Sequence, residues 1–310
     1  RSVGYIEGNL GMDKTLAEKV LKEKFKIDSF RDGQWEIIKN CLEGKKTLLI
    51  AKTGYGKSLC YQFPAIMFRG ITIVISPLIA LMRDQVKKLN ENGIRAASIH
   101  SNHSTDKEEN EKINNQILEE ALLGNIKVLY IAPERQGNLE WQEYLIKMNI
   151  SMVVVDEAHC ISVWGHDFRP DYRKIVEIIK RIPKKIPVLA VTATADNKIA
   201  IDIFTQMKSS EVDKIEIVKR DLFRDNLSLN VIKVKNEEEK MVFLRNYLNK
   251  VKGNGIIYSA TKAGVEKFQK WLEYNKITSA YYHSQIGIER VSIENKFMKN
   301  EYKCIVATNS

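Results

Sequence analysis

The chain has 310 residues, of which 44% are hydrophobic and 28% charged, and it carries a formal net charge of +10 at pH 7. This length gives room for about two domains, each with its own core, and the composition is typical of globular proteins. No apolar run approaches the roughly 18 residues that a membrane helix needs, and no signal segment is visible, so we expect no membrane association. We expect an intracellular protein, in the cytoplasm or nucleoid of a bacterium or the nucleus of a eukaryote.

Two further features of composition limit the function. The four cysteines are widely separated, which predicts buried free thiols rather than a zinc site or a disulfide framework. The basic charge balance suits a polyanionic partner, although proteins without such a partner also show it.

The chain opens with an irregular, glycine-bearing stretch, and we interpret residues 1–12 as a tag remnant or linker. Apolar residues at helical spacing predict a helix over 16–25 and a second one over 35–42. The turn between them reads Phe30-Arg31-Asp32-Gly33-Gln34.

The apolar run 47–50 leads directly into Ala51-Lys52-Thr53-Gly54-Tyr55-Gly56-Lys57-Ser58. The two glycines let the backbone turn so that successive N–H groups face an anion. Lys57 adds a charge for the β- and γ-phosphates, Ser58 offers a hydroxyl to Mg²⁺, and the following helix directs its positive N-terminal end at the same phosphates. Ala51 stands where the strict pattern has glycine and is small enough to keep the turn. The alternative is a glycine turn followed by a chance Lys-Ser. The predicted nucleotide-binding residues here are Thr53, Gly54, Tyr55, Gly56, Lys57, Ser58 and Leu59.

Four more apolar runs, at 71–75, 127–131, 152–155 and 188–191, alternate with helical stretches. Such alternation predicts an α/β fold in which a parallel sheet is covered on both faces and binds ligands at the carboxyl ends of its strands. Between these runs we expect a helix over 79–89, a short strand over 97–99 and a helical stretch over 102–124. The motifs that follow the runs are Ser76-Pro77-Leu78, Ala132-Pro133-Glu134, Asp156-Glu157-Ala158-His159 and Thr192-Ala193-Thr194.

A strand that ends in two carboxylates completes the predicted nucleotide site. Asp156 can hold Mg²⁺ directly or through water, while Glu157 orients and deprotonates the attacking water. The alternative is that Asp156 and Glu157 cap the next helix. We favour the nucleotide site because phosphoryl transfer needs both a phosphate loop and such carboxylates.

The segment Asp156-Glu157-Ala158-His159-Cys160-Ile161-Ser162, followed by Trp164-Gly165-His166-Asp167-Phe168-Arg169-Pro170, resembles the signature of RecQ-family DNA helicases in helicase superfamily 2. The resemblance is dense over residues 25–194 and looser from there to 310. It implies RecA-like lobes with parallel sheets, a complete first lobe over 13–221 and a partial second lobe over 222–310.

The resemblance also implies roles for residues around the nucleotide. Gln34 is expected to hydrogen-bond the adenine edge and Arg31 to pack on the base. Lys57, Asp156, Glu157 and His159 are implied as catalytic, with Ser58 and Asp156 as Mg²⁺ ligands. His159 is the expected partner of the segment 192–194, which links hydrolysis to opening of the cleft in this family.

Nucleic-acid contacts are implied at the same edge of the sheet. Residues 164–168 resemble the aromatic-rich loop that couples single-stranded DNA to ATP hydrolysis, and base stacking on such rings contributes roughly 1–3 kcal/mol without sequence preference. The alternative is that Trp164 and Phe168 are core residues. For the strand-end loops that resemble DNA-backbone contacts, plain helix capping is the alternative. The expected contacts are Ser76, Pro77, Pro133, Glu134, Trp164, His166, Phe168 and Arg169.

Beyond residue 220 the pattern restarts. Residues 223–227 resemble the crossover between two RecA-like lobes, and a helix over 237–251 and a strand over 255–259 follow. In this family the strand over 304–308 leads into a segment with arginine fingers, and then into a zinc-binding module and a winged helix. The sequence stops at Ser310, so we expect an incomplete second-lobe sheet and slow ATP hydrolysis by this chain alone.

These features predict the motor core of an ATP-dependent DNA helicase that couples ATP hydrolysis to strand separation, and the resemblance implies 3′–5′ movement and roles in DNA repair and recombination. ATP and Mg²⁺ are the expected cofactors, and DNA, as single strands and duplex junctions, is the expected partner. One alternative is an RNA-acting helicase of the same superfamily, and another is a nucleotide-dependent DNA-binding module without turnover. ATPase assays with single-stranded DNA, with single-stranded RNA and without nucleic acid separate the three.

Overall fold

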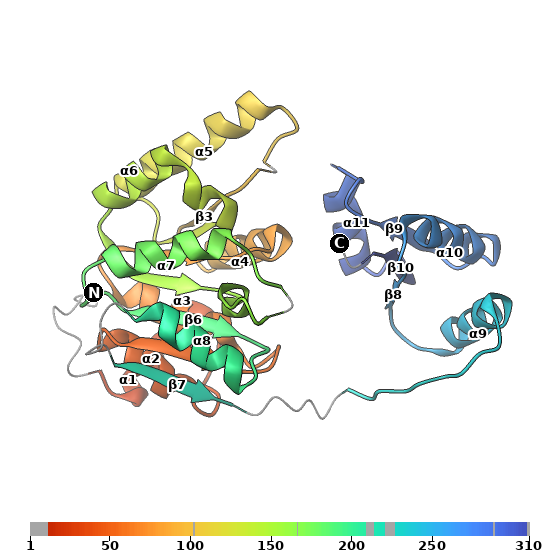
Figure 1. The fold of residues 1–310 in the computed structure, drawn as a ribbon, viewed down its shortest axis with the longest axis horizontal. Helices are drawn as coiled ribbons and strands as arrows, with labels where there is room; N and C mark the ends of the chain where they lie inside the picture. The colour runs from red at the N-terminus through yellow and green to blue at the C-terminus, as the bar shows by residue number, and fades with distance from the viewer. Residues whose placement is uncertain are drawn as a thin grey trace. The chain divides into compact units, whose positions relative to one another are not determined.

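A computed structural model describes residues 12–101, 103–165, 167–208, 214–220, 227–287 and 289–308. The chain divides into two compact units, residues 1–225 and residues 226–310 (Figure 1). The expected linker at the N-terminus and most of the expected crossover at 223–227 lie outside the described residues.

The first unit is built on a parallel sheet of seven strands within its described residues, in the order β3-β4-β2-β5-β6-β1-β7. Every pair of neighbours in this sheet is parallel, as the alternation of apolar runs and helices predicts. The strands are β1 (Lys46–Ile50), β2 (Ile71–Ile75), β3 (Ala96–Ile99), β4 (Val128–Ile131), β5 (Ile150–Val155), β6 (Val188–Thr192) and β7 (Ile215–Lys219).

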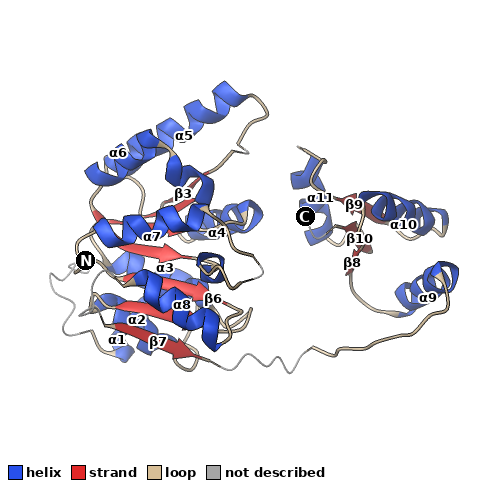
Figure 2. Ribbon diagram, in the orientation of Figure 1, coloured by secondary structure: helices blue, strands red, loops and turns tan. Residues whose placement is uncertain are grey.

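Helices cover both faces of this sheet (Figure 2). Neighbouring strand residues point to opposite faces, so that Leu48 belongs to one apolar cluster and Leu49 to the other. The first cluster contains side chains from α5 to α8, and the second contains side chains from α1 to α4. The helices are α1 (Lys14–Phe25), α2 (Gln34–Leu42), α3 (Lys57–Met67), α4 (Ile79–Glu91), α5 (Lys107–Leu122), α6 (Leu139–Lys147), α7 (Asp171–Arg181) and α8 (Asn197–Met207), with short 3-10 turns η1 (Pro133–Gly137) and η2 (Ala158–Ile161).

The second unit contains a smaller parallel sheet, whose described strands follow the order β8-β10-β9. One side of it packs Val265, Leu272 and Val306 together, and the other packs Ala280 and Ile305. β8 lies at an edge, and its Ile256 and Tyr258 side chains are 51% and 65% exposed. The elements are α9 (Glu237–Lys250), β8 (Gly255–Tyr258), α10 (Lys262–Tyr274), β9 (Ser279–Tyr282), α11 (Glu289–Met298) and β10 (Cys304–Ala307).

Most expected elements are present, with two differences in the first unit. The helical stretch expected over 102–124 is shorter, because Asp106 caps α5 by accepting a hydrogen bond from the Glu109 N–H at 2.8 Å. β7 was not expected from the sequence. The four cysteines are free and buried, as predicted. Among the helices of the described residues, none has the length and apolarity to span a membrane.

Candidate nucleotide and nucleic-acid site

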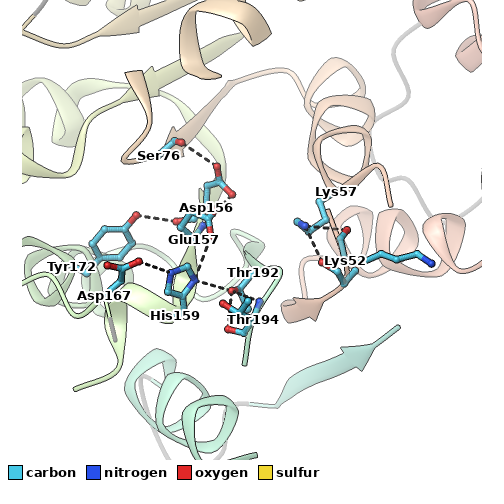
Figure 3. Close-up of polar contacts among 11 residues, drawn as sticks. Lys52, Lys57, Ser76, Asp156, Glu157, His159, Asp167, Tyr172, Thr192 and Thr194 are labelled. Atoms are coloured by element: carbon cyan, nitrogen blue, oxygen red, sulfur yellow. Dashed lines mark hydrogen bonds and ion pairs between the residues drawn. The ribbon is translucent and has the colours of Figure 1, made fainter. Parts of the chain in front are cut away.

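The predicted phosphate loop connects β1 to α3 at the carboxyl edge of the sheet. Gly54 and Gly56 adopt φ angles of 86° and 95°, which residues with a Cβ rarely adopt. The Lys57 ammonium folds back into the loop and donates to the carbonyls of Ala51 at 2.8 Å and Lys52 at 3.2 Å (Figure 3). Burial lowers the pKa of Lys57, although the carboxylates of Glu157 and Asp156 oppose the shift. The loop therefore places one half-buried cation at the N-terminus of α3, where the first N–H groups of a helix have no intrahelical partners.

The strand order explains why distant motifs meet at this loop. β6 lies between β5 and β1, so the ends of these three strands are neighbours. The Ala51 N–H donates to the Thr192 carbonyl at 3.0 Å, which joins the phosphate loop to the segment after β6. Asp156 follows β5 directly, and its N–H donates to the Ile75 carbonyl at 2.8 Å. One edge of the sheet thus holds the phosphate loop, the 192–194 segment and the two carboxylates.

Asp156 is held in a fixed orientation by its neighbours. The Ser76 hydroxyl donates to its Oδ2 at 3.0 Å, and the Glu157 N–H donates to its Oδ1 at 3.0 Å. The buried Tyr172 hydroxyl donates to the Asp156 carbonyl oxygen at 2.9 Å. Burial raises the pKa of the Asp156 carboxyl to about 6, and the nearby charge of Glu157 adds to the rise. A group that costs this much to ionise is suited to a cation that would compensate its charge.

Glu157 has a left-handed backbone with φ of 50°, which is uncommon for a residue with a side chain. Strain of this kind occurs where surrounding structure fixes a residue, and it clusters at functional sites. Burial raises the pKa of the Glu157 carboxyl, while the positive charge of Lys57 opposes the rise. Glu157 therefore combines a constrained backbone with an environment that raises the proton affinity of its carboxylate.

His159 joins Glu157 to the segment after β6, as the resemblance implied. Its Nδ1 lies 3.2 Å from Glu157 Oε2 and 2.9 Å from Thr192 Oγ1 (Figure 3). Burial lowers the pKa of His159, so the ring is mostly neutral at pH 7. The Thr192 hydroxyl also exchanges hydrogen bonds with the backbone of Thr194, at 3.2 Å each. A change at Glu157 can therefore reach the loop after β6 through one imidazole.

The turn before α2 also contacts the phosphate loop. Gln34 is buried, and its amide nitrogen donates to the carbonyls of Tyr55 at 3.3 Å and Gly56 at 3.2 Å. Its amide oxygen accepts the Arg31 N–H at 2.8 Å, and the Arg31 guanidinium donates to the Gly54 carbonyl. Both residues predicted to read the base, Arg31 and Gln34, therefore form side-chain hydrogen bonds to backbone carbonyls of the phosphate loop.

The loop after η2 carries the predicted aromatic residues. The Trp164 side chain is 60% exposed, which excludes the alternative of a core tryptophan. The Lys198 ammonium lies 3.4 Å from the centre of its ring. Phe168 is half-buried, with the Arg173 guanidinium 5.5 Å from its ring centre. Arg169 is exposed, and its charge acts on the carboxyl of Glu157. The predicted contact His166 lies outside the described residues.

The other predicted nucleic-acid residues differ in accessibility. Ser76 is 1% exposed, and its hydroxyl is used by Asp156. Pro133 is also buried, whereas Pro77 is half-buried and Glu134 is exposed. Of these four residues, Pro77 and Glu134 present side chains at the surface. Ser76 has a site role that the sequence did not suggest, because it orients a carboxylate eighty positions away in the chain.

Sequence reasoning missed several other residues near the site. Tyr172 and Lys198 lie on helices that follow the recognised motifs, and no local pattern distinguishes them. Asp202 accepts the hydroxyl of the buried Ser162 at 2.6 Å and so ties α8 to the aromatic-rich loop. Arg220 follows β7, an element that was itself not predicted. For Asp202 the sequence offered one signal, which is Ser162 within the recognised signature. A buried serine hydroxyl needs a hydrogen-bond partner, and Asp202 is that partner.

Residues 31–201 match the family of DEAD/DEAH box helicases. The chain belongs to this family. It is 38% identical over 297 residues to the ATP-dependent DNA helicase RecQ of Bacillus subtilis. The alignment covers 95% of this chain and 48% of that protein. It is 36% identical over 304 residues to the RecQ helicase of Haemophilus influenzae, covering 96% of this chain and 46% of that protein. The resemblance to RecQ helicases is therefore confirmed, and the chain spans about half the length of these relatives.

A solved structure supports the fold separately. The helicase Lhr of Mycobacterium smegmatis, bound to ssDNA and AMP-PNP, aligns with a TM-score of 0.67 at 15% sequence identity. The alignment covers 92% of this chain and 40% of Lhr. The predicted α/β fold with RecA-like parallel sheets is confirmed.

Proposed function

We propose that this chain is the ATP-binding motor core of an ATP-dependent DNA helicase that moves 3′ to 5′ and separates DNA strands. The observation that carries the proposal is the meeting of Lys57, Asp156, Glu157 and His159 at the ends of neighbouring strands. The names of the RecQ relatives, which are ATP-dependent DNA helicases, support it. The proposal includes an intracellular location, a first lobe over 13–221 and a second-lobe segment over 222–310.

The residues at the phosphate loop fit ATP with Mg²⁺. A nucleotide phosphate fits a loop whose glycines have positive φ angles and whose lysine ammonium donates to two backbone carbonyls, at 2.8 and 3.2 Å. Oxygen donors are the ligands that Mg²⁺ prefers, and we assign Ser58 and Asp156 to it. A Mg²⁺ held there would neutralise negative charge that develops on the phosphate during phosphoryl transfer. In the described residues no three His, Cys, Asp or Glu side chains form a metal cluster. A site with Ser58 and Asp156 as its protein ligands suits a metal that is held mainly by the nucleotide phosphates.

The chain's own residues divide the work of hydrolysis. Lys57 holds the β- and γ-phosphates, and Glu157 orients a water and takes its proton, for which a raised pKa is favourable. His159 contacts both the Glu157 carboxylate and the Thr192 hydroxyl, so a shift of Glu157 is transmitted to Thr192. Gln34 and Arg31 read the adenine, and we assign the 40% exposed Ile27 an apolar contact with the base. The remaining contacts to the nucleotide are Thr53, Gly54, Tyr55, Gly56, Ser58 and Leu59.

DNA is proposed to bind at the loops that follow the strands. Trp164 has the exposure that base stacking requires, and Phe168 and the exposed Arg169 follow it. Pro77 and Glu134 stand at the surface of the strand-end loops, while the buried Ser76 and Pro133 shape those loops from beneath. Backbone contacts of this type carry no sequence information, which suits a motor that acts on any strand.

The test is ATP turnover by the full-length protein that carries this chain, measured without nucleic acid, with single-stranded DNA and with single-stranded RNA. We expect turnover that DNA stimulates more than RNA does. Stimulation by RNA alone would assign the chain to RNA, and DNA binding without turnover under any condition would make it a binding module.

Two variants show whether the turnover comes from this site. Glu157→Gln should keep ATP binding and lose at least about a hundredfold in turnover, as expected for loss of a general base. Glu177→Gln is the matched control, since Glu177 is an exposed residue of α7 that pairs with Lys180. Equal turnover in the two variants would contradict the assignment of Glu157.

A further inference from the structure

Arg220 lies where the last strand of the first unit meets the phosphate loop. β7 pairs in parallel with β1, and Lys219 is opposite Ile50. One residue later, the Arg220 N–H donates to the Ile50 carbonyl at 2.9 Å. The backbone of Arg220 is therefore fixed beside Ala51, the first residue of the phosphate loop.

The Arg220 side chain crosses the turn that precedes α2. Its Nη2 donates to Glu36 Oε2 at 2.6 Å, and its Nη1 lies 3.9 Å from Asp32 Oδ2. The guanidinium passes so close to Gly33 that a Cβ on this residue would lie 2.2 Å from the Arg220 Cζ. Gly33 has a φ of 75°, a conformation that favours glycine, and the Arg220 guanidinium occupies the space that a Cβ would take.

The same turn is bound to the phosphate loop from its other side. The Tyr55 hydroxyl donates to the Asp32 carbonyl at 2.7 Å, and Gln34 donates to the carbonyls of Tyr55 and Gly56. Asp32, Gly33 and Gln34 are thus held between the Arg220 guanidinium and the phosphate loop. The Arg220 side chain is 26% exposed, whereas the side chains of Glu36 and Asp32 are 63% and 100% exposed, so solvent screens the charge pairing and the packing of the guanidinium over Gly33 contributes to the contact.

We propose that Arg220 is a positioning residue that fixes the turn of residues 31–34 against the phosphate loop and thereby sets the preference for adenine over other bases. This inference rests on the proposed function, in which Gln34 and Arg31 read the base. Arg220 itself does not touch the nucleotide. It acts through the position of the turn, because a hydrogen bond to a base edge depends on distance and angle.

This role predicts a selective defect. Loss of the guanidinium frees Glu36 in the first turn of α2 and leaves the turn attached to the phosphate loop through Tyr55, Gln34 and Arg31. The phosphate loop keeps its glycines and Lys57, so phosphate binding should persist. Recognition of adenine should weaken, since the base-reading amide loses its fixed position.

The experiment measures the binding of ATP, GTP and inorganic tripolyphosphate, each with Mg²⁺, to the whole chain by calorimetry. In Arg220→Ala we expect ATP affinity to fall about five- to tenfold, the loss of one well-placed hydrogen bond, with GTP and tripolyphosphate unchanged. Glu36→Gln changes only an exposed side chain and should reproduce part of the loss. Arg220→Lys keeps the charge without the planar fork and should be intermediate. Lys219→Ala is the matched control, because Lys219 is the last residue of β7, directly before Arg220, and its ammonium donates to Asn197 instead.

The possible outcomes separate this inference from the proposed function. An unchanged ATP-to-GTP ratio in Arg220→Ala, with a wild-type chain that prefers ATP, overturns the role of Arg220 alone. An equal fall in affinity for ATP, GTP and tripolyphosphate would assign Arg220 a purely structural role. A lower melting temperature without a change in the ATP-to-GTP affinity ratio would do the same. Either result overturns the positioning role. A wild-type chain without any preference for ATP overturns the base-reading proposal and this inference together.

Discussion

Asp156→Asn is expected to stabilise the nucleotide-free protein at neutral pH. Asparagine has nearly the same shape, and its oxygen can accept the Glu157 N–H while its amide donates to the Ser76 hydroxyl, so both local contacts are retained. The substitution removes a buried charge that has only partial compensation in the free protein. The variant therefore avoids the free-energy cost of burying this carboxylate, and its free energy of unfolding should be higher than that of the wild type.

The magnitude follows from the pKa of Asp156, which burial raises from its ordinary value of 3.8 to about 6. A shift of about 2 units corresponds to about 3 kcal/mol, as an upper estimate. Because the folded-state pKa is the higher one, the stability is fully present below the unfolded value and is lost as pH rises through about 6. For a unit of this size, the gain corresponds to a rise in melting temperature of up to about 6–12 °C at pH 7.5.

The assay is thermal unfolding in EDTA at pH 7.5 and pH 4.5. The advantage of Asp156→Asn should shrink by more than half at the lower pH, where the wild-type carboxyl is protonated in the folded state. Asp202→Asn is a matched control, because Asp202 also accepts a serine hydroxyl, at 2.6 Å, and it should show no gain. A variant less stable than wild type at pH 7.5, or a gain that does not depend on pH, would refute the reasoning.

Two further substitutions test the nucleotide and DNA contacts. Lys57→Ala should weaken ATP binding at least about tenfold, since a charge-assisted hydrogen bond to phosphate contributes roughly 1.5–3 kcal/mol; unchanged affinity in calorimetry, with the fold verified, would remove Lys57 from the site. Trp164→Ala should weaken single-stranded DNA binding by about five- to a hundredfold in fluorescence anisotropy while sparing ATP binding, since stacking contributes roughly 1–3 kcal/mol per base. A sharp fall in melting temperature with normal DNA binding would instead make Trp164 a structural residue.

The order of elements in the first unit could be predicted because its strands are buried on both faces. A strand such as β2, with the sequence Ile71-Thr72-Ile73-Val74-Ile75, forms a continuous apolar run that contrasts with the helices beside it. β7 escaped this criterion because it lies at an edge of the sheet, where Glu216 and Ile217 are exposed. An edge strand needs fewer apolar residues, so its pattern is weaker.

Site residues could be predicted only where chemistry depends on local spacing. The phosphate loop and the Asp156-Glu157 pair are each formed by consecutive residues, so a sequence pattern can identify them. Ser76 and Arg220 act on residues far away in the chain, and their contacts exist only once the strands are ordered. Gln34 shows an intermediate case, because its motif was recognised but its burial against the phosphate loop was not.

The contact between Trp164 and Lys198 should make the intrinsic tryptophan fluorescence of the protein sensitive to DNA binding. The sequence has four tryptophans. Trp141 is 2% exposed, and Trp35 and Trp271 pack against the apolar clusters of their units, whereas Trp164 is 60% exposed under the Lys198 ammonium. A base that stacks on the face under Lys198 displaces the ammonium, and a base on the opposite face also changes the surroundings of the ring. Emission from Trp164 should therefore change as the strand binds, and stopped-flow measurements on the unlabelled chain can follow that step in real time.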